Sequence, residues 1–491
     1  MVFSELTFLY FFLPIVILLH FAAGNTKIRN VIVLLTGLIF YAWGEPFYVL
    51  IMLFSTAIDY TAGRLMAKYD DDQKKRRICL IVSVCMNVGL LAVFKYSDFI
   101  FDSINSAFHC SLQNPVLAVN KGLNKLLPLG LNEKRVELPI GISFYTFQSM
   151  SYTIDLYLRN ITVQKSFLNF ASYVSLFPQI VAGPIVRYEE VSKELEARRV
   201  NVMKISSGIG LFVKGLAKKV LLANRAGLIW AEIKGADFAA NYATLSVLGA
   251  WLGIIAFAFQ IYFDFSGYSD MAMGLGKMMG FDFPKNFDHP YISRSVSEFW
   301  RRWHITLGSW FRSYVYIPLG GNRKGKGRTF LNLLIVWGLT GLWHGASWNF
   351  LLWGLYFGIL IIIERAGGSK LLEKLPHALS ALWTFILVLF GWVLFDTDTL
   401  GDAVRYITAM FGAGGAFIDD TVKYLLISNA LLLAVCTVIS VGLGQKLLER
   451  ITKRRPAFAE IAAIPVKIGI LLICTAYLVN SEYNPFLYFR F

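Results

Sequence analysis

Residues 245–265 read LSVLGAWLGIIAFAFQIYFDF, a run in which Asp264 is the one charged residue. Its length is close to the roughly 20 residues that carry an α-helix across a bilayer, so it predicts a membrane-spanning helix. Further clear apolar runs lie at 6–21, 31–43, 47–62, 78–94, 351–363, 382–395, 425–443 and 461–479. Counting shorter runs as well, the sequence predicts an all-α polytopic membrane protein with about 11–12 transmembrane helices, together with re-entrant or interfacial helices.

The composition agrees with this fold class. Hydrophobic residues make up 56% of the 491 positions, charged residues 16%, and the mean hydropathy is +0.55. One water-soluble core could not use so much apolar side chain. The polar gaps are short and no composition break separates a second domain, so residues 1–491 are expected to form one integral membrane domain.

The net charge of +15 is explained by where the basic residues fall. They gather in the gaps at 64–77, 323–328, 365–374 and 446–455, which the positive-inside rule places in the cytoplasm. Threading the runs through these gaps places both the N-terminus and residues 484–491 outside. Because this topology already explains the basic residues, no nucleic-acid partner is expected.

The first run and the cysteines exclude other classes. The first six residues contain no Lys or Arg and include Glu5, which favours an uncleaved first helix over a signal peptide. The five cysteines are scattered without a CxxC or Cys/His spacing. Neither a disulfide framework, a metal site nor a bound cofactor is therefore expected.

The middle of the chain, at about 138–344, differs from the flanking runs because Gly, Pro and charged residues interrupt it. Carboxylates such as Asp264 and Asp270, and irregular backbone, are tolerated at membrane depth only where protein or a water-filled cavity surrounds them. We therefore expect the functional core here.

Two histidines stand out in this core. His344 follows the apolar run 331–343 and precedes the small residues 345–347, so its ring is expected inside the membrane with space beside it for a substrate. An imidazole there is suited to general-base work on a hydroxyl. A core histidine bonded to a carbonyl would give the same pattern, and both interpretations stay open.

His304 lies in the block 298–314, EFWRRWHITLGSWFRSY, which is too charged to span. Its interleaved aromatic and arginine residues are typical of a helix at the membrane interface, where the arginines could simply extend toward water. A glycine-rich basic turn, IPLGGNRKGK at 317–326, follows on the predicted cytoplasmic side and could bind the phosphates of a cytosolic donor. The predicted donor-binding residues are Arg301, Arg302, Arg312, Arg323 and Lys324.

Several segments resemble the membrane-bound O-acyltransferase family, and within it the bacterial alginate O-acetyltransferase branch. They follow one another over nearly the whole chain: VFSELTFL at 2–9, FYTFQSMSY at 144–152 with Asp155, FPQIVAGPIVR at 177–187, DFSGYSD at 264–270, the block at 299–312 and GLWHGA at 341–346. The resemblance implies acyl transfer across the membrane, with His344 as the catalytic residue in a tunnel and His304 as its companion. It also implies a division into peripheral spans at 1–110 and 378–480, a catalytic core at 138–365 and a C-terminal motif at 486–491.

The chain ends in FLYFRF at 486–491. This resembles the terminal aromatic hexapeptide of the same branch, which also occurs on a small separate protein of the related D-alanylation system, where its tyrosine is proposed to carry the acyl group. Tyr488 is the corresponding residue, and its phenol, with an ordinary pKa of about 10, would need a base such as His344. An interfacial aromatic anchor is the alternative.

The resemblance implies an acetyltransferase in a bacterial inner membrane, in contact with lipid. It also implies acetyl-CoA or another acyl thioester as the donor, an external SGNH-hydrolase-like acetyltransferase as the partner, and a secreted or cell-wall polysaccharide as the final acceptor. D-alanyl transfer to teichoic acid and a non-enzymatic transporter built on Asp264 and Asp270 remain alternatives.

Overall fold

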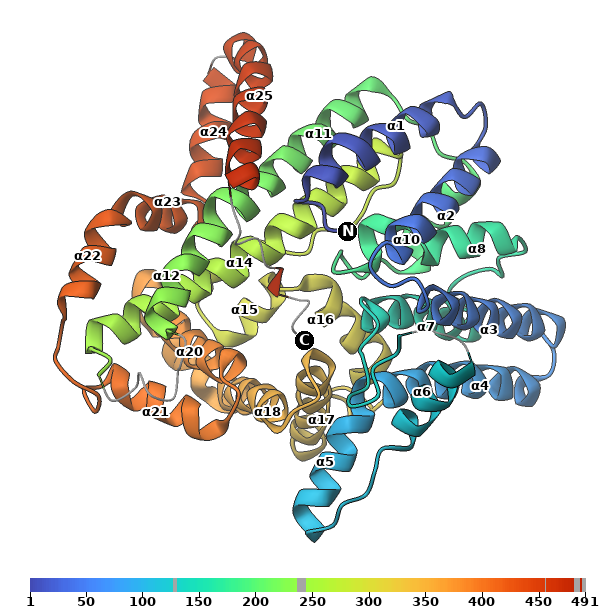
Figure 1. Ribbon diagram of the computed structural model, residues 1–491, viewed down its shortest axis with the longest axis horizontal. Helices are drawn as coiled ribbons and strands as arrows, with labels where there is room; N and C mark the ends of the chain where they lie inside the picture. The colour runs from blue at the N-terminus through green and yellow to red at the C-terminus, as the bar shows by residue number, and fades with distance from the viewer. Residues whose placement is uncertain (127–129, 236–243, 455, 481–485, 488–491) are drawn as a thin grey trace. The chain divides into compact units, whose positions relative to one another are not determined.

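The computed structural model describes residues 1–126, 130–235, 244–454, 456–480 and 486–487. All regular elements within these ranges are helices, and the ranges contain no strand (Figure 1). The chain forms two compact units, each assembled from separate stretches. The first unit contains residues 1–208, 272–284 and 345–347, and the second contains 209–271, 285–344 and 348–491.

The helices of the first unit come mostly from the N-terminal part of the chain. They are η1 (Phe8–Phe12), α1 (Leu13–Ala22), α2 (Thr26–Ala42), α3 (Val49–Lys68), α4 (Gln73–Leu91), η2 (Ala92–Tyr96), α5 (Ser97–Phe108), α6 (Pro115–Leu126), α7 (Ile142–Tyr157), α8 (Phe167–Val174), α9 (Phe177–Ile180) and α10 (Tyr188–Glu196). Helix α11 (Val202–Ala217) begins in this unit and ends in the second.

Helices α3, α4 and α7 pack together in the first unit (Figure 1). Asp59 of α3 is fully buried between them. Its carboxylate accepts hydrogen bonds from Ser83 Oγ at 2.6 Å and Asn87 Nδ2 at 2.9 Å, both on α4. Ser83 Oγ also lies 2.9 Å from Thr153 Oγ1 of α7. The buried carboxylate is thus surrounded by hydrogen-bond donors, which ties the three helices to one another.

The second unit contains the remaining elements. They are η3 (Lys218–Ala223), α12 (Asn224–Lys234), α14 (Val247–Met278, whose last residues belong to the first unit), η4 (Pro290–Ile292), α15 (Val296–Arg302), α16 (Ile305–Phe311), η5 (Arg312–Tyr316), α17 (Lys326–His344), α18 (Trp348–Ile363), η6 (Glu364–Gly368), α19 (Ser369–Lys374), α20 (His377–Asp396), α21 (Leu400–Met410), α22 (Asp420–Ser428), α23 (Ala430–Ser440), α24 (Leu443–Arg454) and α25 (Pro456–Asn480).

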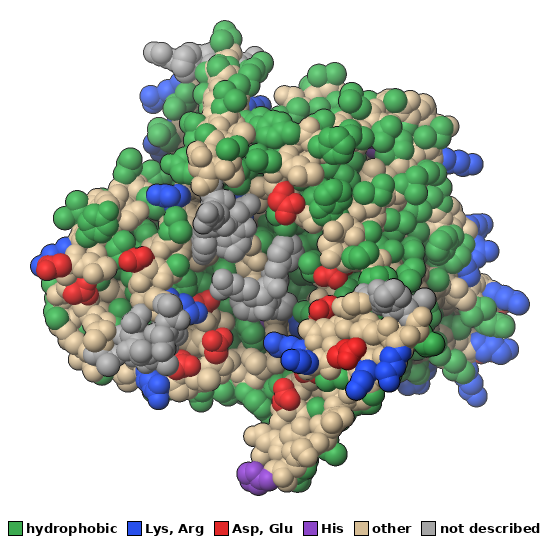
Figure 2. Space-filling model, in the orientation of Figure 1, with side chains coloured by type: hydrophobic (Ala, Val, Ile, Leu, Met, Phe, Trp, Pro, Cys, Tyr) green, Lys and Arg blue, Asp and Glu red, His purple; other side chains and the backbone are tan. Residues whose placement is uncertain are grey.

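Within the described ranges, six helical segments are long and apolar enough to cross a membrane, or seven if the pair α22 and α23, bent by 62°, is one span. The six are Val49–Lys68, Gln73–Phe108, Val247–Met278, Trp348–Lys374, His377–Asp396 and Ile461–Asn480. Their outward faces are apolar: on α25, Ile464 is 65% exposed and Leu472 62%. Hydrophobic side chains also cover much of the face shown in Figure 2. Large exposed apolar surfaces of this kind are stable when lipid covers them.

The predicted all-α polytopic membrane fold is confirmed. Most of each clear apolar run lies in helix, although residues 425–443 include a bent pair rather than one straight span. Among the described residues, fewer helices are long and apolar enough to span a membrane than the 11–12 expected, because several apolar helices are short or carry charge. The helix α17, for example, contains Lys326 and Arg328. The central tunnel and the division into peripheral spans and core stay predictions.

Candidate active site

His344 is the last residue of α17 and its side chain is buried in the second unit. The ring nitrogen Nδ1 lies 2.8 Å from the carbonyl oxygen of Thr340, one turn earlier in the helix. The rings of Trp353 and Phe395 pack against the imidazole, with centroids at 4.8 and 5.8 Å. Since a carbonyl oxygen only accepts, Nδ1 of the neutral ring carries the proton and Nε2 carries the lone pair. His344 is thereby oriented as a base at Nε2.

His304 lies between α15 and α16, where the chain changes direction. Its φ of +47° is in the left-handed region, a backbone conformation that residues other than glycine rarely adopt. The side chain is buried, and Nδ1 lies 3.2 Å from Oδ1 of Asn286. That oxygen also accepts from the backbone N–H of Thr306 at 3.2 Å and from the Thr306 hydroxyl at 2.9 Å. Asn286 thus holds His304 in the same tautomer as His344, protonated at Nδ1.

Burial lowers the pKa of His304 well below its ordinary value, and the nearby His344 lowers it further. The His304 ring is therefore neutral at physiological pH. Such a ring can bind or orient a polar group without adding a positive charge to the site.

Aromatic rings connect the two histidines. The ring of Trp343 has its centroid 5.9 Å from that of His304 and 5.0 Å from that of His344. Phe265 of α14 packs edge-on against His304 at 4.7 Å. The second unit therefore brings together two histidines that lie 40 positions apart in the chain, in surroundings that exclude water and strengthen electrostatic interactions.

The block 298–314, expected as one interfacial helix, is divided into α15, α16 and η5. The left-handed conformation at His304 separates the first two helices. Its aromatic residues are also more deeply placed than an interfacial helix would have them: Phe299, Trp303 and Trp310 are all buried. The helix breaks because Asn286 binds the backbone and side chain at the junction, which a local sequence pattern does not reveal.

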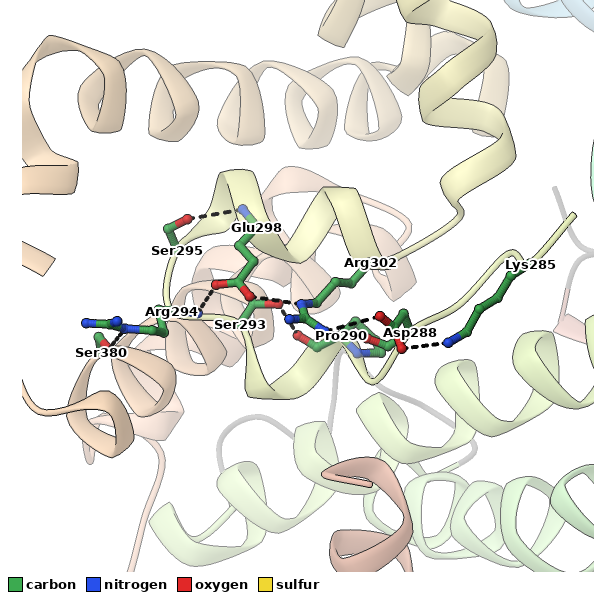
Figure 3. Close-up of polar contacts among 9 residues, drawn as sticks. All are labelled: Lys285, Asp288, Pro290, Ser293, Arg294, Ser295, Glu298, Arg302 and Ser380. Carbon is green, nitrogen blue, oxygen red and sulfur yellow. Dashed lines mark hydrogen bonds and ion pairs between the residues drawn. The ribbon is translucent and has the colours of Figure 1, made fainter. Parts of the chain in front are cut away.

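Arg302 is engaged within the chain (Figure 3). Its Nε donates to Glu298 at 2.9 Å, and its guanidinium also contacts the Asp288 carboxylate at 3.3 Å. Lys285 donates to Asp288 at 2.7 Å, and this bond is the main reason that the pKa of Asp288 is lowered. Arg302 thus joins α15 to the segment before it, which leaves it less suited to bind a donor than the sequence suggested.

The N-terminus of α15 is fixed by Ser295 and by a carboxylate from another element. Ser295 Oγ accepts from the backbone N–H of Glu298, as Figure 3 shows. The buried Glu364 of η6 accepts from the backbone N–H groups of Val296 and Ser297. A carboxylate at a helix N-terminus is stabilising, so α15 and the His304 junction that follows it are held firmly.

The other predicted donor-binding residues, Arg301, Arg312, Arg323 and Lys324, are exposed in the second unit. The glycine-rich turn adopts conformations that favour glycine, with φ of +103° at Gly320 and +54° at Gly321. Asn332 of α17 donates to the carbonyl of Gly321 at 3.0 Å and so fixes the turn to the helix that ends in His344. These four basic side chains are available to a phosphate group, and their binding role stays a prediction.

The carboxylates of α14 are paired with lysines. Asp264 lies 2.6 Å from Lys219 Nζ, and both side chains are almost fully buried. Asp270 lies 2.8 Å from Lys218 Nζ and also contacts Lys214 at 3.5 Å. The transporter alternative relied on these carboxylates as a permeation path. The structure instead assigns each of them a cationic partner from η3 or α11.

The C-terminal motif enters this region through Phe486 and Leu487, which are both buried. The backbone N–H of Leu487 donates to Asp264 Oδ2 at 2.9 Å. The ring of Phe486 stacks on that of Tyr268 with centroids 4.7 Å apart. Tyr488, the predicted carrier, lies outside the described residues, one peptide bond beyond Leu487.

Sequence reasoning missed Asn286, Lys219 and Glu364. Nothing near Asn286 in the chain marks it, because the residues it binds lie 18 and 20 positions away. Lys219 did leave a signal: it lies in the apolar run 209–223, where a lysine needs a partner. The two aspartates of DFSGYSD were the natural candidates for that partner.

Comparison with known proteins identifies the family of this chain. A model of the membrane-bound O-acyltransferase family, MBOAT, matches residues 43–393. The chain is similar to the probable alginate O-acetylase AlgI of Pseudomonas putida, with 35% identity over all of both chains. It is also similar to the peptidoglycan O-acetyltransferase of Helicobacter pylori, with 32% identity over 84% of this chain and 80% of that one. The teichoic acid D-alanyltransferase of Streptococcus thermophilus is 28% identical over 52% of this chain and 68% of its own.

These matches decide between the enzyme and the transporter, which the sequence had left open, in favour of a membrane-bound acyltransferase. The family model covers both histidines and most of the described helices. From its fold and from these comparisons, the chain belongs to the membrane-bound O-acyltransferase family.

Proposed function

We propose that this protein transfers an acetyl group from cytosolic acetyl-CoA toward a polysaccharide outside the cell, with His344 as general base and Tyr488 as the first acceptor. The observation that carries this proposal is the buried His344 ring, whose Nδ1–H is held by the Thr340 carbonyl so that Nε2 bears the lone pair. Two similar proteins are named for O-acetylation of alginate and of peptidoglycan, which supports acetyl as the transferred group and a polysaccharide as the acceptor.

In the first step, Nε2 of His344 takes the proton of the Tyr488 hydroxyl. The phenolate oxygen bonds to the acyl carbon, the carbon–sulfur bond of the thioester breaks, and the leaving thiolate takes the proton from the imidazolium. His304, neutral and held by Asn286, assists by orienting a polar group beside His344. Arg301, Arg312, Arg323 and Lys324 bind the donor phosphates on the cytoplasmic side.

In the second step, a hydroxyl oxygen of the acceptor bonds to the acyl carbon of the aryl ester, the bond from that carbon to the Tyr488 oxygen breaks, and the hydroxyl proton returns the phenolate to the phenol. An external SGNH-hydrolase-like partner performs this step on the polysaccharide. Placement of the C-terminus outside, which follows from the charge of the loops, suits delivery on that face. The membrane is then the inner membrane of a bacterium, because that membrane separates acetyl-CoA from a secreted or cell-wall polysaccharide.

The deciding experiment is intact-protein mass spectrometry after incubation with isotope-labelled acetyl-CoA. We expect one label on Tyr488, absent from Tyr488→Phe and from His344→Ala. His377→Ala is the matched control, since His377 is an exposed histidine at the start of α20. Full labelling of His344→Ala would reject the general base, and full polysaccharide acetylation by Tyr488→Phe would reject the carrier.

D-alanyl transfer is the second candidate, supported by the similarity to teichoic acid D-alanyltransferases over about half the chain. The same labelling experiment, run once with each donor, separates the two candidates. Label taken up from a D-alanyl thioester of a carrier protein, and not from acetyl-CoA, would favour the second candidate. The aromatic hexapeptide at the end of this chain favours acetyl transfer. In the related D-alanylation system, the similar hexapeptide occurs on a small separate protein.

A further inference from the structure

Two residues of the C-terminal motif are docked inside the second unit. Phe486 is 5% exposed and Leu487 3%, although a terminal aromatic anchor would keep its rings at the lipid interface. Their described contacts converge on one place. Leu487 donates its backbone N–H to Asp264, and Phe486 stacks on Tyr268 while Lys219 Nζ lies 5.9 Å from its ring centroid.

The ion pair at this place is expensive to bury. Asp264 and Lys219 have side chains 2% and 4% exposed, and removing two charges from water costs more than their attraction returns unless further hydrogen bonds satisfy them. The tail supplies one of these bonds. Asp264 Oδ1 lies 2.6 Å from Lys219 Nζ in the ion pair, and Oδ2 accepts a hydrogen bond from the backbone N–H of Leu487 at 2.9 Å, so the two carboxylate oxygens contact different partners.

The helices are built so that these residues meet. In the second unit, Gly215 of α11 lies so close to α14 that an added Cβ would be 2.4 Å from the Gly267 carbonyl oxygen. This close approach places η3, with Lys219, against the turn of α14 that carries Asp264. Tyr268 lies one helical turn beyond Asp264, so both face the same side of α14.

The same turn of α14 leads to the histidines. Phe265 follows Asp264 directly, and its ring packs on His304 at 4.7 Å. A tail bound to Asp264 is therefore held beside the element that lines the histidine site.

We infer that Asp264, Lys219 and Tyr268 form a seat for the C-terminal tail. Asp264 and Lys219 act as positioning residues for the tail: Asp264 accepts from the backbone N–H of Leu487, and the Lys219 ammonium lies over the ring of Phe486. Binding of the tail in the seat does not depend on acyl transfer. Only the role of the tail as an acyl carrier rests on the proposed function.

The test is hydrogen–deuterium exchange of the C-terminal peptide in the full chain. The seat variant, Asp264→Leu with Lys219→Met, replaces the buried pair by apolar residues, which cores tolerate when both charges go together. We expect the tail amides to exchange about tenfold faster or more than in the unaltered protein, because Leu487 loses a charged acceptor. The matched control, Asp270→Leu with Lys218→Met, removes the neighbouring pair on the same elements and should leave exchange in the tail unchanged.

Unchanged protection of the tail in the seat variant would overturn the inference, and so would an equal increase in the matched control. Phe486→Ala gives a second measurement that leaves the ion pair intact. It removes the stacking on Tyr268 and should also accelerate exchange of the tail amides, while unchanged exchange would count against the seat.

Tyr488→Phe separates the seat from the proposed function. It removes the phenol but none of the described seat contacts, so the tail should stay protected while acetyl labelling is lost. Retained acetyl transfer in this variant would reject the carrier and leave the seat standing. Lost protection in this variant would instead reject a seat made by Asp264, Lys219 and Tyr268.

Discussion

The two histidines are held by the same ring nitrogen but through different partners. His344 donates to a carbonyl of its own helix, whereas His304 donates to a side chain from a distant loop. A helical carbonyl is present in any helix, so the orientation of His344 follows from its position at the end of α17. The described hydrogen bond that orients His304 is made to Asn286, 18 positions away, which makes this orientation the more sensitive of the two to substitution elsewhere in the chain.

We expect His304 to make the stability depend on pH. Its folded-state pKa is lowered well below the ordinary value of about 6.5, so below about pH 6.5 the unfolded chain binds a proton that the folded protein does not. The free energy of unfolding should fall by about 1.4 kcal/mol between about pH 7.5 and about pH 5.5 on account of this residue. Thermal unfolding in detergent at both pH values measures the difference.

His304→Asn is the control for this pH effect, because asparagine tolerates the left-handed backbone but does not titrate. The variant should lack this part of the pH dependence. An identical pH dependence in the two proteins would mean that His304 titrates normally in the folded state.

Asn286→Ala should lower both stability and turnover. The His304 ring, the Thr306 N–H and the Thr306 hydroxyl all lose their common acceptor, at a cost of about 2–3 kcal/mol in the free energy of unfolding. We also expect kcat to fall with little change in KM for the donor, because the His304 ring is no longer oriented. Thr306→Val removes only one of the three bonds and should retain most of the activity. A KM effect with unchanged kcat would place Asn286 in donor binding instead.

At the scale of elements, the contact between α17 and α18 decides where His344 lies. Gly341, three residues before His344, is so close to α18 that an added Cβ would be 2.2 Å from the Phe350 carbonyl oxygen. Gly354 of α18 is equally close to the Trp337 carbonyl oxygen. The two helices lie side by side in Figure 1. Small residues permit this close packing, as is common between helices in membranes.

Gly341→Ala should therefore displace α18 and reduce activity strongly, with destabilisation of about 1–3 kcal/mol from overpacking. Gly338→Ala, one turn earlier on the same helix, is the matched control. Its Cβ would meet Leu351 at 3.6 Å, an ordinary contact, so stability and activity should be close to those of the unaltered protein. Equal effects of the two substitutions on unfolding and acetyl transfer would contradict a role for the close approach.

At the scale of the whole molecule, the charge of the loops predicts the topology. The turn with Lys324 is basic and the segment 396–420 is acidic, and the first is expected in the cytoplasm and the second outside. Both ends of the chain would then lie outside, on the face where the proposed mechanism delivers the acetyl group.

Cysteine labelling tests this topology. Lys324 and Asp398 are exposed in the second unit, and Cys can replace each of them in a chain whose five native cysteines have been removed. A membrane-impermeant maleimide should label Asp398→Cys in intact spheroplasts and Lys324→Cys only after their membrane has been permeabilised. Labelling of both from the same side would refute the assignment of the loops.

The helices and the histidines could be read from the chain because each depends on local sequence. An apolar run of sufficient length has few alternatives to a helix in lipid, and an imidazole between two such runs is conspicuous. Arg302 shows the limit of such reasoning. In the sequence it lies beside other arginines of the same block, which are exposed in the structure, yet the Arg302 guanidinium is bound by Glu298 and Asp288.

The sequence by itself determined the fold class, the membrane setting and the two histidines, because hydrophobic length and the cost of a buried imidazole act residue by residue. Only the tertiary structure decided which partners orient them. Asn286 reaches His304 across 18 positions, and Leu487 reaches Asp264 across 223. Such pairs form because packed helices exclude water, which obliges each buried polar group to find a partner wherever the fold places one.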